Sequence, residues 1–417
     1  MTSADGHRHT PRVVVTGMGS VSCAGTGNAA LLDALQQQRS GIRFMETLAA
    51  LGMRCRVGGP VDETALDAPS RKLRRFLCAT TWYAWQAMRE AIAQAGLAPG
   101  DLQSPHCGLV MGGGAALSEH EIALDSFRQR GIGKLSPFIV PRGMSSALAA
   151  GLAYAFDIGG RSHVVSAACT SGAHAIGQAM ELIQMGKQDI VICGGSEELH
   201  DTTALWFDAM GALSANSNER PSAASRPYDA DRDGIVLAAG AGVLVLESLE
   251  HARRRGAAVI AEVCGYGAST EAQSMVGPGA EGIARAMRQA LASHASPDYI
   301  NTHACSTAQG DLAEWQAIEQ VFRERDAAPP PMSSIKGLIG HAPGAAGALD
   351  AIAGLLMMRH DFLAAGSAIE TPDPAFAEAP LVTAPIHRRI GSVLSNSFGF
   401  GGSCASLLFH AAVGSYA

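Results

Sequence analysis

Short runs of β-branched and other apolar residues alternate along this chain with longer, alanine-rich stretches in which apolar residues recur every three or four positions. The short runs predict buried strands, and the longer stretches predict amphipathic helices. The predicted strands are residues 12–16, 107–111, 162–166, 189–193, 242–246, 261–266, 298–302, 332–335, 390–394 and 405–409. The predicted helices are residues 74–95, 171–185, 281–294, 312–325 and 346–358. This alternation predicts an α/β fold whose parallel strands are joined by helical crossovers.

The pattern also suggests where the chain divides. A basic helical segment, residues 250–256, precedes a new series of strands and helices. We therefore expect two packed halves, residues 1–256 and 257–417, although no clear sequence repeat relates them. The polar stretch 214–234 is expected to be a long surface loop, and the Pro-rich residues 327–331 a connector.

Composition narrows the functional class. The 417 residues are 47% hydrophobic and 17% charged, which is typical of a globular protein with a large core. A net charge of −7 argues against a general nucleic-acid binder. The N-terminus has no apolar signal segment, and the most apolar helical stretch is too short to span a bilayer. The nine cysteines include no Cys-x-x-Cys pair, so we expect reduced thiols in the cytoplasm rather than disulfides or a zinc site.

Three motif fragments lack the context that their usual functions need. Residues 17–22 begin like a dinucleotide fingerprint, but the third glycine and the later acidic residue are missing, so we expect a tight strand exit. Residues 229–234 imitate the start of a calcium loop, yet Gly240 stands where a bidentate Glu is required. Ser333-x-x-Lys336 lacks the companion motifs of serine acylases. We therefore expect no metal and no resident cofactor.

The sequence SAACTSGAH, residues 166–174, places Cys169 between a strand and a helix that begins at about Thr170. A helix N-terminus carries partial positive charge and free N–H groups, which favour a thiolate over a thiol. The same amides can stabilise an oxyanion on a bound thioester. A lone cysteine is often an inert core residue. Its position at this junction favours a nucleophile for acyl transfer instead.

Two histidines and a glycine-rich loop follow other predicted strands. His303 follows strand 298–302, and His341 follows strand 332–335. Because the carboxyl ends of such strands line one crevice, we expect both imidazoles to meet Cys169 there. The segment SNSFGFGG, residues 395–402, has glycines that permit a mobile loop, and its two phenylalanines suit a gate. A tight hairpin before the last strand is the alternative.

These motifs resemble those of the elongating β-ketoacyl-acyl carrier protein synthases, condensing enzymes of the bacterial synthase I/II class. The resemblance covers residues 12 to about 410 and rests on SAACTSGAH, NTHACSTAQGD, SSIKGLIGHAPGAAG and SNSFGFGG, supported by GKQDIVICGGSEE, FDAMGALS and SRPYDADRDGIVLAAGAGVLVLE. It implies a thiolase-like fold with two similar halves in a layered α-β-α-β-α core.

The resemblance also implies a reaction. Cys169 would take an acyl chain from the phosphopantetheine of a carrier protein. Malonyl-carrier protein would then lose carbon dioxide, and its enolate would extend the chain by two carbons. His303 and His341 match the pair that stabilises the enolate. The chemistry needs hydrogen-bond donors aimed at the thioester oxygen, which two neutral imidazoles can supply.

Further positions match supporting roles in the family. Lys336 matches the motif lysine, and Glu314 stands where the family places the carboxylate partner of that lysine. The backbone amides of Cys169 and Phe400 match the oxyanion hole. Phe400 also matches the gating aromatic, and Phe398 lies beside the malonyl site.

One departure concerns the pantetheine contact. Many members have His-Gly-Thr-Ser-Thr, whereas this chain has His303-Ala304-Cys305-Ser306-Thr307. Cys305 replaces a threonine that hydrogen-bonds pantetheine, while Thr307 is retained. A thiol is a weaker donor than a hydroxyl, so carrier binding is expected to be weaker or differently oriented.

The expected pathway and partners follow from the resemblance. The motifs CTSG and SSIK resemble ketosynthases of type II polyketide and aryl-polyene pathways, which we expect here, with housekeeping fatty-acid elongation as the alternative. The expected partner is an acyl carrier protein, acyl- or malonyl-loaded, and such carriers are acidic, so the net acidic chain needs a local basic patch. Candidates for this patch, each of which is equally well explained as an ordinary solvated charge, are Arg71, Lys72, Arg74, Arg75, Arg128, Arg130 and Lys134.

The resemblance further suggests a homodimer or a heterodimer with a chain-length partner. Two other functions remain open. One is a non-catalytic chain-length partner, although such subunits lack the nucleophile that this chain keeps. The other is a hydrolase or acyl exchanger that uses the same thiol without condensation.

Overall fold

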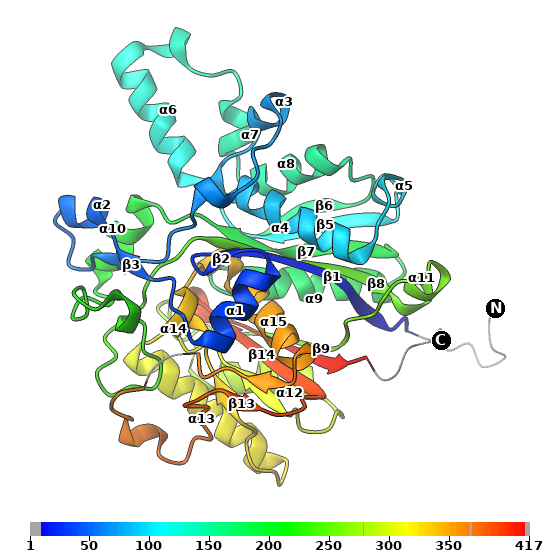
Figure 1. Ribbon diagram of the computed structural model, residues 1–417, viewed down its shortest axis with the longest axis vertical. Coiled ribbons are helices and arrows are strands. Elements are labelled where there is room, and N and C mark those ends of the chain that lie inside the picture. The colour runs from blue at the N-terminus through cyan, green and yellow to red at the C-terminus, as the bar shows by residue number, and fades with distance from the viewer. Residues whose placement is uncertain (1–9, 278, 367–368, 413–417) are drawn as a thin grey trace.

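The computed structural model describes residues 10–277, 279–366 and 369–412. Its largest sheet has 11 strands in the order β11-β10-β14-β15-β9-β1-β8-β7-β5-β6, with β2 paired to β1 (Figure 1). These strands are β1 (Val13–Ser22), β2 (Gly25–Thr26), β5 (Cys107–Gly112), β6 (Ser162–Val165), β7 (Ile190–Glu197), β8 (Gly240–Ser248), β9 (Ala261–Thr270), β10 (Tyr299–Asn301), β11 (Met332–Ser333), β14 (Ser392–Phe398) and β15 (Ser403–Ala411). Two small sheets pair β3 (Arg43–Phe44) with β4 (Val57–Gly58) and β12 (Phe362–Leu363) with β13 (Ile386–His387). All ten predicted strands are present, several of them longer than predicted.

The large sheet consists of two halves with the same topology. In the order β6-β5-β7-β8-β1, only β8 runs antiparallel to its neighbours. In the order β11-β10-β14-β15-β9, only β15 does so. The halves join through a short antiparallel contact between β1 and β9, in which Val14 faces Glu262. A topological repeat therefore exists where the sequence shows none, while the division into domains at residue 256 stays a prediction.

Helices form three layers around these two half-sheets. The helices are α1 (Asn28–Gln37), α2 (Glu46–Ala50), α3 (Arg71–Arg74), α4 (Ala79–Ala95), α5 (Pro99–Leu102), α6 (Leu117–Arg130), α7 (Ile139–Gly143), α8 (Ala147–Phe156), α9 (Ser171–Gln184), α10 (Asp201–Met210), α11 (Leu249–Arg254), α12 (Ala280–Leu291), α13 (Ala308–Glu324), α14 (Lys336–Ile339) and α15 (Pro343–Arg359). Helices α4 and α8 pack on the first half-sheet, and α12, which packs against α13, covers the second. Helices α9 and α15 contact each other between the half-sheets. The α-β-α-β-α order confirms the thiolase-like prediction.

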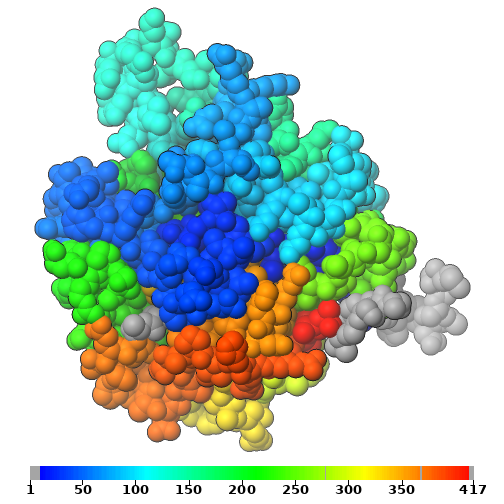
Figure 2. All heavy atoms as spheres, in the orientation of Figure 1, coloured from blue at the N-terminus to red at the C-terminus, as the bar shows by residue number. Residues whose placement is uncertain are grey.

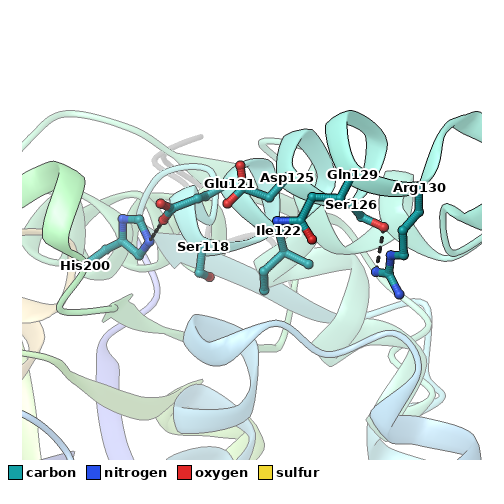
Figure 3. A pocket seen from close by; sticks show the side chains of 8 residues that line it. All are labelled: Ser118, Glu121, Ile122, Asp125, Ser126, Gln129, Arg130 and His200. Atoms are coloured by element: carbon teal, nitrogen blue, oxygen red, sulfur yellow. Dashed lines mark hydrogen bonds and ion pairs between the residues drawn. The ribbon is translucent and has the colours of Figure 1, made fainter.

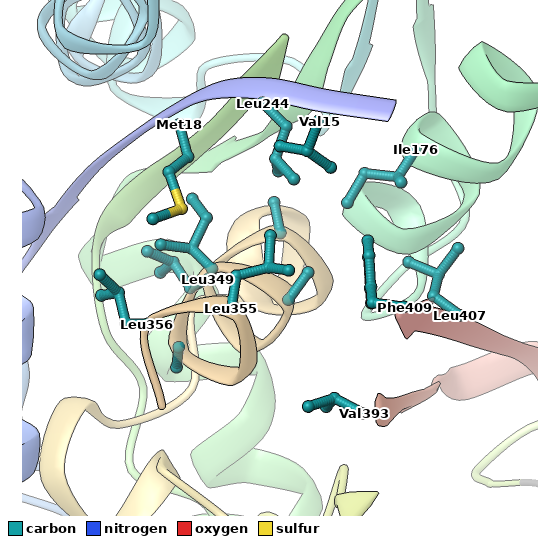
Figure 4. Packing of buried hydrophobic residues seen from close by; sticks show 14 of the residues in the cluster. Val15, Met18, Ile176, Leu244, Leu349, Leu355, Leu356, Val393, Leu407 and Phe409 are labelled. Atoms are coloured by element: carbon teal, nitrogen blue, oxygen red, sulfur yellow. The ribbon is translucent and has the colours of Figure 1, made fainter. Parts of the chain in front are cut away.

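The central layer explains why one helix lacks an amphipathic pattern. Every residue of α15 from Gly344 to Met358 is buried, because strands of both half-sheets and α9 surround it. A helix buried on all sides is apolar all round. Figure 4 shows Leu349 and Leu355 of α15 among Met18, Ile176 and Phe409 of the surrounding elements. Within the described part of the chain, no helix combines the length and the apolarity needed to cross a membrane.

Two local predictions were wrong. The predicted helix 74–95 is interrupted: α3 ends at Arg74, and α4 begins only at Ala79. The glycines 17 and 19 do not form a strand exit but lie inside β1, against α4. A Cβ added at Gly17 would lie 2.1 Å from the carbonyl oxygen of Ala91. These glycines therefore permit close packing of a strand on a helix.

The stretch 214–234 is not wholly a surface loop. Residues 224–229 are buried. The carboxylate of Asp229 accepts hydrogen bonds from the amides of Glu370 and Thr371, and Arg226 pairs with it at 3.4 Å. The resemblance to a calcium loop is thus explained by Asp–Arg and Asp–amide pairing, which fixes this segment against residues 370–373.

Candidate active site

Cys169 sits on a tight turn between β6 and α9. Ala168, which precedes it, has a φ of 50°, in the left-handed region that side chains disfavour. Hydrogen bonds lock this turn: the Thr170 hydroxyl donates to the carbonyl of Ala167 at 2.6 Å, and the Ser171 hydroxyl donates to that of Ala168 at 2.6 Å. The thiol therefore has a fixed position at the N-terminus of α9, where the sequence predicted it.

The structure brings His303 and His341 to this thiol. His303 follows β10, and His341 lies between α14 and α15. The Cys169 sulfur and one nitrogen of each imidazole lie within 4.8 Å of one another. The two rings are 5.3 Å apart at 82°, and the Phe398 ring lies 5.7 Å from that of His303. The two halves of the fold thus supply one cluster, in which the first half gives the thiol and the second gives both imidazoles.

Both imidazoles are neutral in this environment. Burial and, to a smaller extent, the charge of Lys336 lower the pKa of His341 to about 3. Burial, Lys336 and His341 together hold the pKa of His303 well below its ordinary value. Among the described residues, Nδ1 of His303 and both ring nitrogens of His341 have no hydrogen-bond partner. Buried polar groups are nearly always paired, so these atoms are available to a ligand.

Lys336 is paired differently from the prediction. Its ammonium donates to the carboxylate of Asp350 at 2.6 Å, and both side chains are 1% exposed. Glu314 instead accepts the backbone N–H groups of His303 and Ala304, at 2.9 and 2.8 Å. Glu314 is thus not the hydrogen-bonded partner of the lysine. It fixes the backbone that carries His303, because two adjacent amides there require an acceptor.

The protonation state of the thiol also differs from the prediction. Burial and, after it, the charge of Glu197 raise the pKa of Cys169, which is about 12 in total. Lys336 and hydrogen bonds from the amides of Cys169 and Phe400 lower the pKa but do not offset burial. The resting group is a thiol rather than the expected thiolate, because burial is a tertiary effect that the local helix terminus cannot reveal. The same hydrogen bonds show that both amides point at the sulfur.

A cavity of about 640 Å³ opens onto this cluster. It is lined by Cys169, His303, His341, Phe398 and Phe400, and also by Cys305, Thr307, Met210, Ile235 and Ile283. The Phe400 ring stacks on that of Phe207 at 5.5 Å, a contact that sequence reasoning missed because α10 lies far away in the chain. The sulfur of Cys305 lies 3.9 Å from the Thr307 hydroxyl.

The cluster is also the one set in the described residues that could hold a metal ion. A thiolate and two neutral imidazoles are donors that Zn²⁺ accepts, with a fourth position left open. The high pKa of the thiol opposes this use, because a metal must displace the proton. The arrangement therefore fits acyl chemistry on sulfur better than a permanent metal site.

The basic residues predicted to dock a carrier lie away from this cluster, on exposed segments around α3, α6 and α7. Arg71, Lys72 and Arg75 belong to or follow α3, Arg130 ends α6, and Lys134 lies in the next turn. The ring of Phe76 lies 5.1 Å from that of Phe138, which joins the α3 and α7 segments. These segments project together from the body of the molecule (Figures 1 and 2).

A second hollow, of about 390 Å³, lies along α6 and contains none of the cluster residues. Figure 3 shows its lining, in which His200 pairs with Glu121 at 2.9 Å and Arg130 donates to Ser126 at 2.8 Å. The Arg130 guanidinium thus lies at the edge of this hollow. Its chemistry, mostly that of exposed charged groups, does not resemble a catalytic centre.

Comparison with known proteins agrees with this geometry. The family models for the N-terminal and C-terminal domains of β-ketoacyl synthases match residues 10–252 and 260–369. The chain is 43% identical over 401 residues to 3-oxoacyl-[acyl-carrier-protein] synthase 1 of Escherichia coli, covering 95% of this chain and 98% of that protein. A β-ketoacyl synthase structure from Burkholderia phymatum superposes with a TM-score of 0.90 at 34% identity, covering 97% of this chain and 100% of that one. A type II polyketide ketosynthase in complex with its acyl-carrier protein gives a TM-score of 0.84 at 30% identity, with 97% and 100% coverage. The chain, whose Cys–His–His cluster lies where the two half-sheets meet, belongs to the β-ketoacyl synthase family.

Proposed function

We propose that this protein is a β-ketoacyl-acyl carrier protein synthase that extends a Cys169-bound acyl chain by decarboxylative condensation with malonyl-carrier protein. The observation that carries the proposal is the contact of one thiol with two neutral imidazoles at a cavity of about 640 Å³. Family membership supports it, since a relative with 43% identity is named a synthase of this kind.

Acyl loading uses the thiol and the two amides. The Cys169 sulfur attacks the thioester carbonyl of the acyl-carrier protein, the new S–C bond forms, and the phosphopantetheine thiol leaves with the proton. Because the pKa of the thiol is about 12 and both imidazoles are held neutral, the proton leaves the sulfur only as the S–C bond forms, and the departing phosphopantetheine sulfur takes it up. The amides of Cys169 and Phe400 stabilise the oxyanion.

Condensation uses the two histidines. The bond between the carboxylate and the α-carbon of the malonyl group breaks, carbon dioxide leaves, and the electron pair forms an enolate. His303 and His341 donate hydrogen bonds to the enolate oxygen without protonating its carbon, because both are neutral. The carbon then attacks the acyl carbonyl, and the Cys169 thiolate leaves and takes up one proton. Burial keeps both imidazoles deprotonated for this step, and the charge of Lys336 contributes to the same effect.

The deciding experiment incubates the protein with acyl- and malonyl-carrier protein and weighs enzyme and products. We expect an acyl adduct on Cys169, carbon dioxide, and a β-ketoacyl product two carbons longer. Cys169→Ala should abolish the adduct, whereas His303→Ala and His341→Ala should retain loading but lose condensation. Release of free acid alone would identify a hydrolase. Absence of any adduct on the wild-type thiol would identify a non-catalytic partner subunit.

The biosynthetic pathway in which this enzyme acts is a more specific proposal. The 43% identity to synthase 1 favours elongation of ordinary fatty acyl chains. The likeness to a type II polyketide ketosynthase favours the specialised, polyene-type pathway that the motifs predicted. A panel of saturated, polyenoic and aryl-polyenoic primers distinguishes the two, because each pathway implies a different ratio of loading rates.

We also propose that the exposed basic residues of the α3, α6 and α7 segments dock an acidic carrier protein. The aromatic contact of Phe76 with Phe138 makes these segments one surface. Arg75→Glu should raise the KM for malonyl-carrier protein and leave the rate with a small malonyl thioester unchanged. Arg388→Glu, an exposed charge on the loop after β13, is the matched control. Equal effects of both variants would contradict the docking role.

The assembly is proposed from the edge of the large sheet. β6 is an edge strand with exposed Ser162 and His163, and such edges tend to pair with another chain. We propose a dimer across β6, and native mass spectrometry distinguishes a homodimer, a heterodimer with a chain-length subunit and a monomer. The nine cysteines are free thiols, which supports a reducing compartment such as the cytoplasm.

A further inference from the structure

His174 lies outside the catalytic cluster, yet both of its ring nitrogens are engaged. Nδ1 lies 2.6 Å from the Tyr266 hydroxyl, and Nε2 lies 3.0 Å from the Ser403 hydroxyl. The Ser403 hydroxyl in turn lies 2.8 Å from that of Thr170. Thr170 donates to the carbonyl of Ala167 at 2.6 Å. A chain of hydrogen bonds therefore runs from β9 through α9 and β15 to the turn that carries Cys169.

The carbonyl at the end of this chain fixes its direction. A carbonyl oxygen can only accept a hydrogen bond, so the single hydroxyl proton of Thr170 is donated to the carbonyl of Ala167. Thr170 must then accept from Ser403, and Ser403 must accept from Nε2–H of His174. Nδ1 is left to accept from the Tyr266 hydroxyl. The chain thus requires a proton on Nε2 of His174, and burial lowers the pKa of His174, which favours the neutral tautomer with Nδ1 as an acceptor.

The chain connects the two segments that supply the amides at the sulfur. Ser403 directly follows residues 400–402, and its carbonyl accepts from the amide of Gly399 at 2.9 Å, so it closes the loop that carries Phe400. Thr170 directly follows Cys169. A Cβ added at Gly399 would lie 3.0 Å from the Cys169 amide nitrogen, which shows how closely the loop approaches the turn.

We propose that His174 and Ser403 are positioning residues that clamp the Phe400 loop onto the Cys169 turn. The clamp keeps both amides aimed at one point and keeps the loop over the thiol. This inference rests on the proposed acyl transfer at Cys169 and assigns a role to a histidine that the reaction itself does not use. Loss of the clamp should have two opposite effects: the thiol becomes more accessible, while acyl transfer becomes slower.

Ser403→Ala removes the link, Ser403→Thr retains a hydroxyl, and Ser392→Ala on β14 is the matched control. Three quantities are measured: iodoacetamide modification of Cys169 by peptide mass spectrometry, single-turnover acylation from an acyl-pantetheine thioester, and Tm. For Ser403→Ala we expect modification to rise and acylation to fall, each about fivefold, which corresponds to one hydrogen bond. Ser403→Thr and Ser392→Ala should match the wild type in both rates.

A second pair of variants tests the imidazole. His174→Gln offers an amide N–H to Ser403, and both of its rates should stay near those of the wild type. His174→Phe should raise the modification rate and lower the acylation rate, as Ser403→Ala does. Parallel changes in both rates, or no change, would overturn the clamp. If the wild type is alkylated at Cys169 but never accepts an acyl group, the proposed function fails; the alkylation rates alone then decide whether the loop is clamped.

Discussion

The ammonium of Lys336 and the carboxylate of Asp350 lie 2.6 Å apart, and each side chain is only 1% exposed. The pair stands at the beginning of α14 and in the middle of α15, on either side of His341 in the chain. Burial, and after it the charge of Lys336, lowers the pKa of the His303 and His341 imidazoles. The carboxylate therefore holds in place a cation that adds to the effect of burial on these imidazoles.

Breaking this pair on one side should be costly. Asp350→Asn leaves the Lys336 ammonium buried without its anion, and we expect the free energy of unfolding to fall by about 3–5 kcal/mol. The double variant Lys336→Met, Asp350→Leu should recover most of this loss, because no uncompensated charge remains, yet it should condense more slowly. Urea unfolding measures the stability. A loss below about 1 kcal/mol in Asp350→Asn would contradict a paired, buried charge.

The reactivity of Cys169 should depend on pH up to alkaline values. Because its pKa is raised to about 12, the thiolate fraction grows with pH throughout the neutral range. We expect the rate of iodoacetamide modification at Cys169 to rise about tenfold per pH unit from pH 6 to 9, without a plateau. Peptide mass spectrometry measures this rate, which is compared with the modification rate of free cysteine in solution. A plateau near pH 7 would instead indicate the thiolate that the helix terminus alone predicts.

The histidine pair should make the fold sensitive to acid. The pKa of His341 is about 3 in the folded protein, whereas its ordinary value is 6.5. Between these two pH values the unfolded chain therefore binds a proton that the folded chain does not bind. Stability is thus complete above pH 6.5 and falls as pH drops toward 3, by up to about 1.4 kcal/mol per pH unit for this one group. His341→Gln should lessen the slope between pH 6 and 4 in urea unfolding. An unchanged slope would show that His341 is protonated in the fold.

Local pattern was enough to find the reacting groups. Cys169, His303 and His341 each follow an apolar strand run. The meeting of the two histidines follows from the carboxyl edge that the parallel strands β10 and β11 share. Cys169 follows β6, at the opposite end of the sheet, so its approach to them depends on how the two half-sheets pack. The ion-pair partner of Lys336 could not be predicted from the sequence, because Asp350 lies inside a helix that is buried on all sides and has no polar face to distinguish it.

Properties that arise only from tertiary packing could not be predicted from the sequence either. The helix terminus at Cys169 indicated a thiolate, whereas burial in the folded protein raises the pKa of the thiol. Likewise, Thr170 and Ser403 are 233 positions apart, and nothing in the intervening sequence predicts their hydroxyl contact.

A zinc ion should inhibit the enzyme reversibly. The Cys169 sulfur and one nitrogen each of His303 and His341 lie within 4.8 Å of one another, close enough to converge on one cation. Binding must displace the thiol proton, so inhibition should strengthen as pH rises. We expect added Zn²⁺ to block acyl loading, EDTA to restore it, and EDTA alone to leave the purified enzyme fully active. Lost activity with EDTA alone would contradict a metal-free reaction.

The thiol of Cys305 should weaken the hold on the carrier's phosphopantetheine arm. Its side chain lines the cavity together with that of Thr307, and the Cys305 sulfur lies 3.9 Å from the Thr307 hydroxyl. The family resemblance implies a threonine that hydrogen-bonds pantetheine at this position. A thiol is a poor donor, and burial raises the pKa of Cys305, so it does not act as an anionic acceptor either. Cys305→Thr should therefore add one hydrogen bond, worth about 1 kcal/mol, and lower the KM for malonyl-carrier protein about fivefold at unchanged kcat. Cys305→Ser, which supplies the hydroxyl without the methyl group, should give the same direction, and Cys305→Ala should match the parent enzyme. If Cys305→Ala raises KM as strongly as Cys305→Thr lowers it, the sulfur itself contacts the arm and the weak-donor account is wrong.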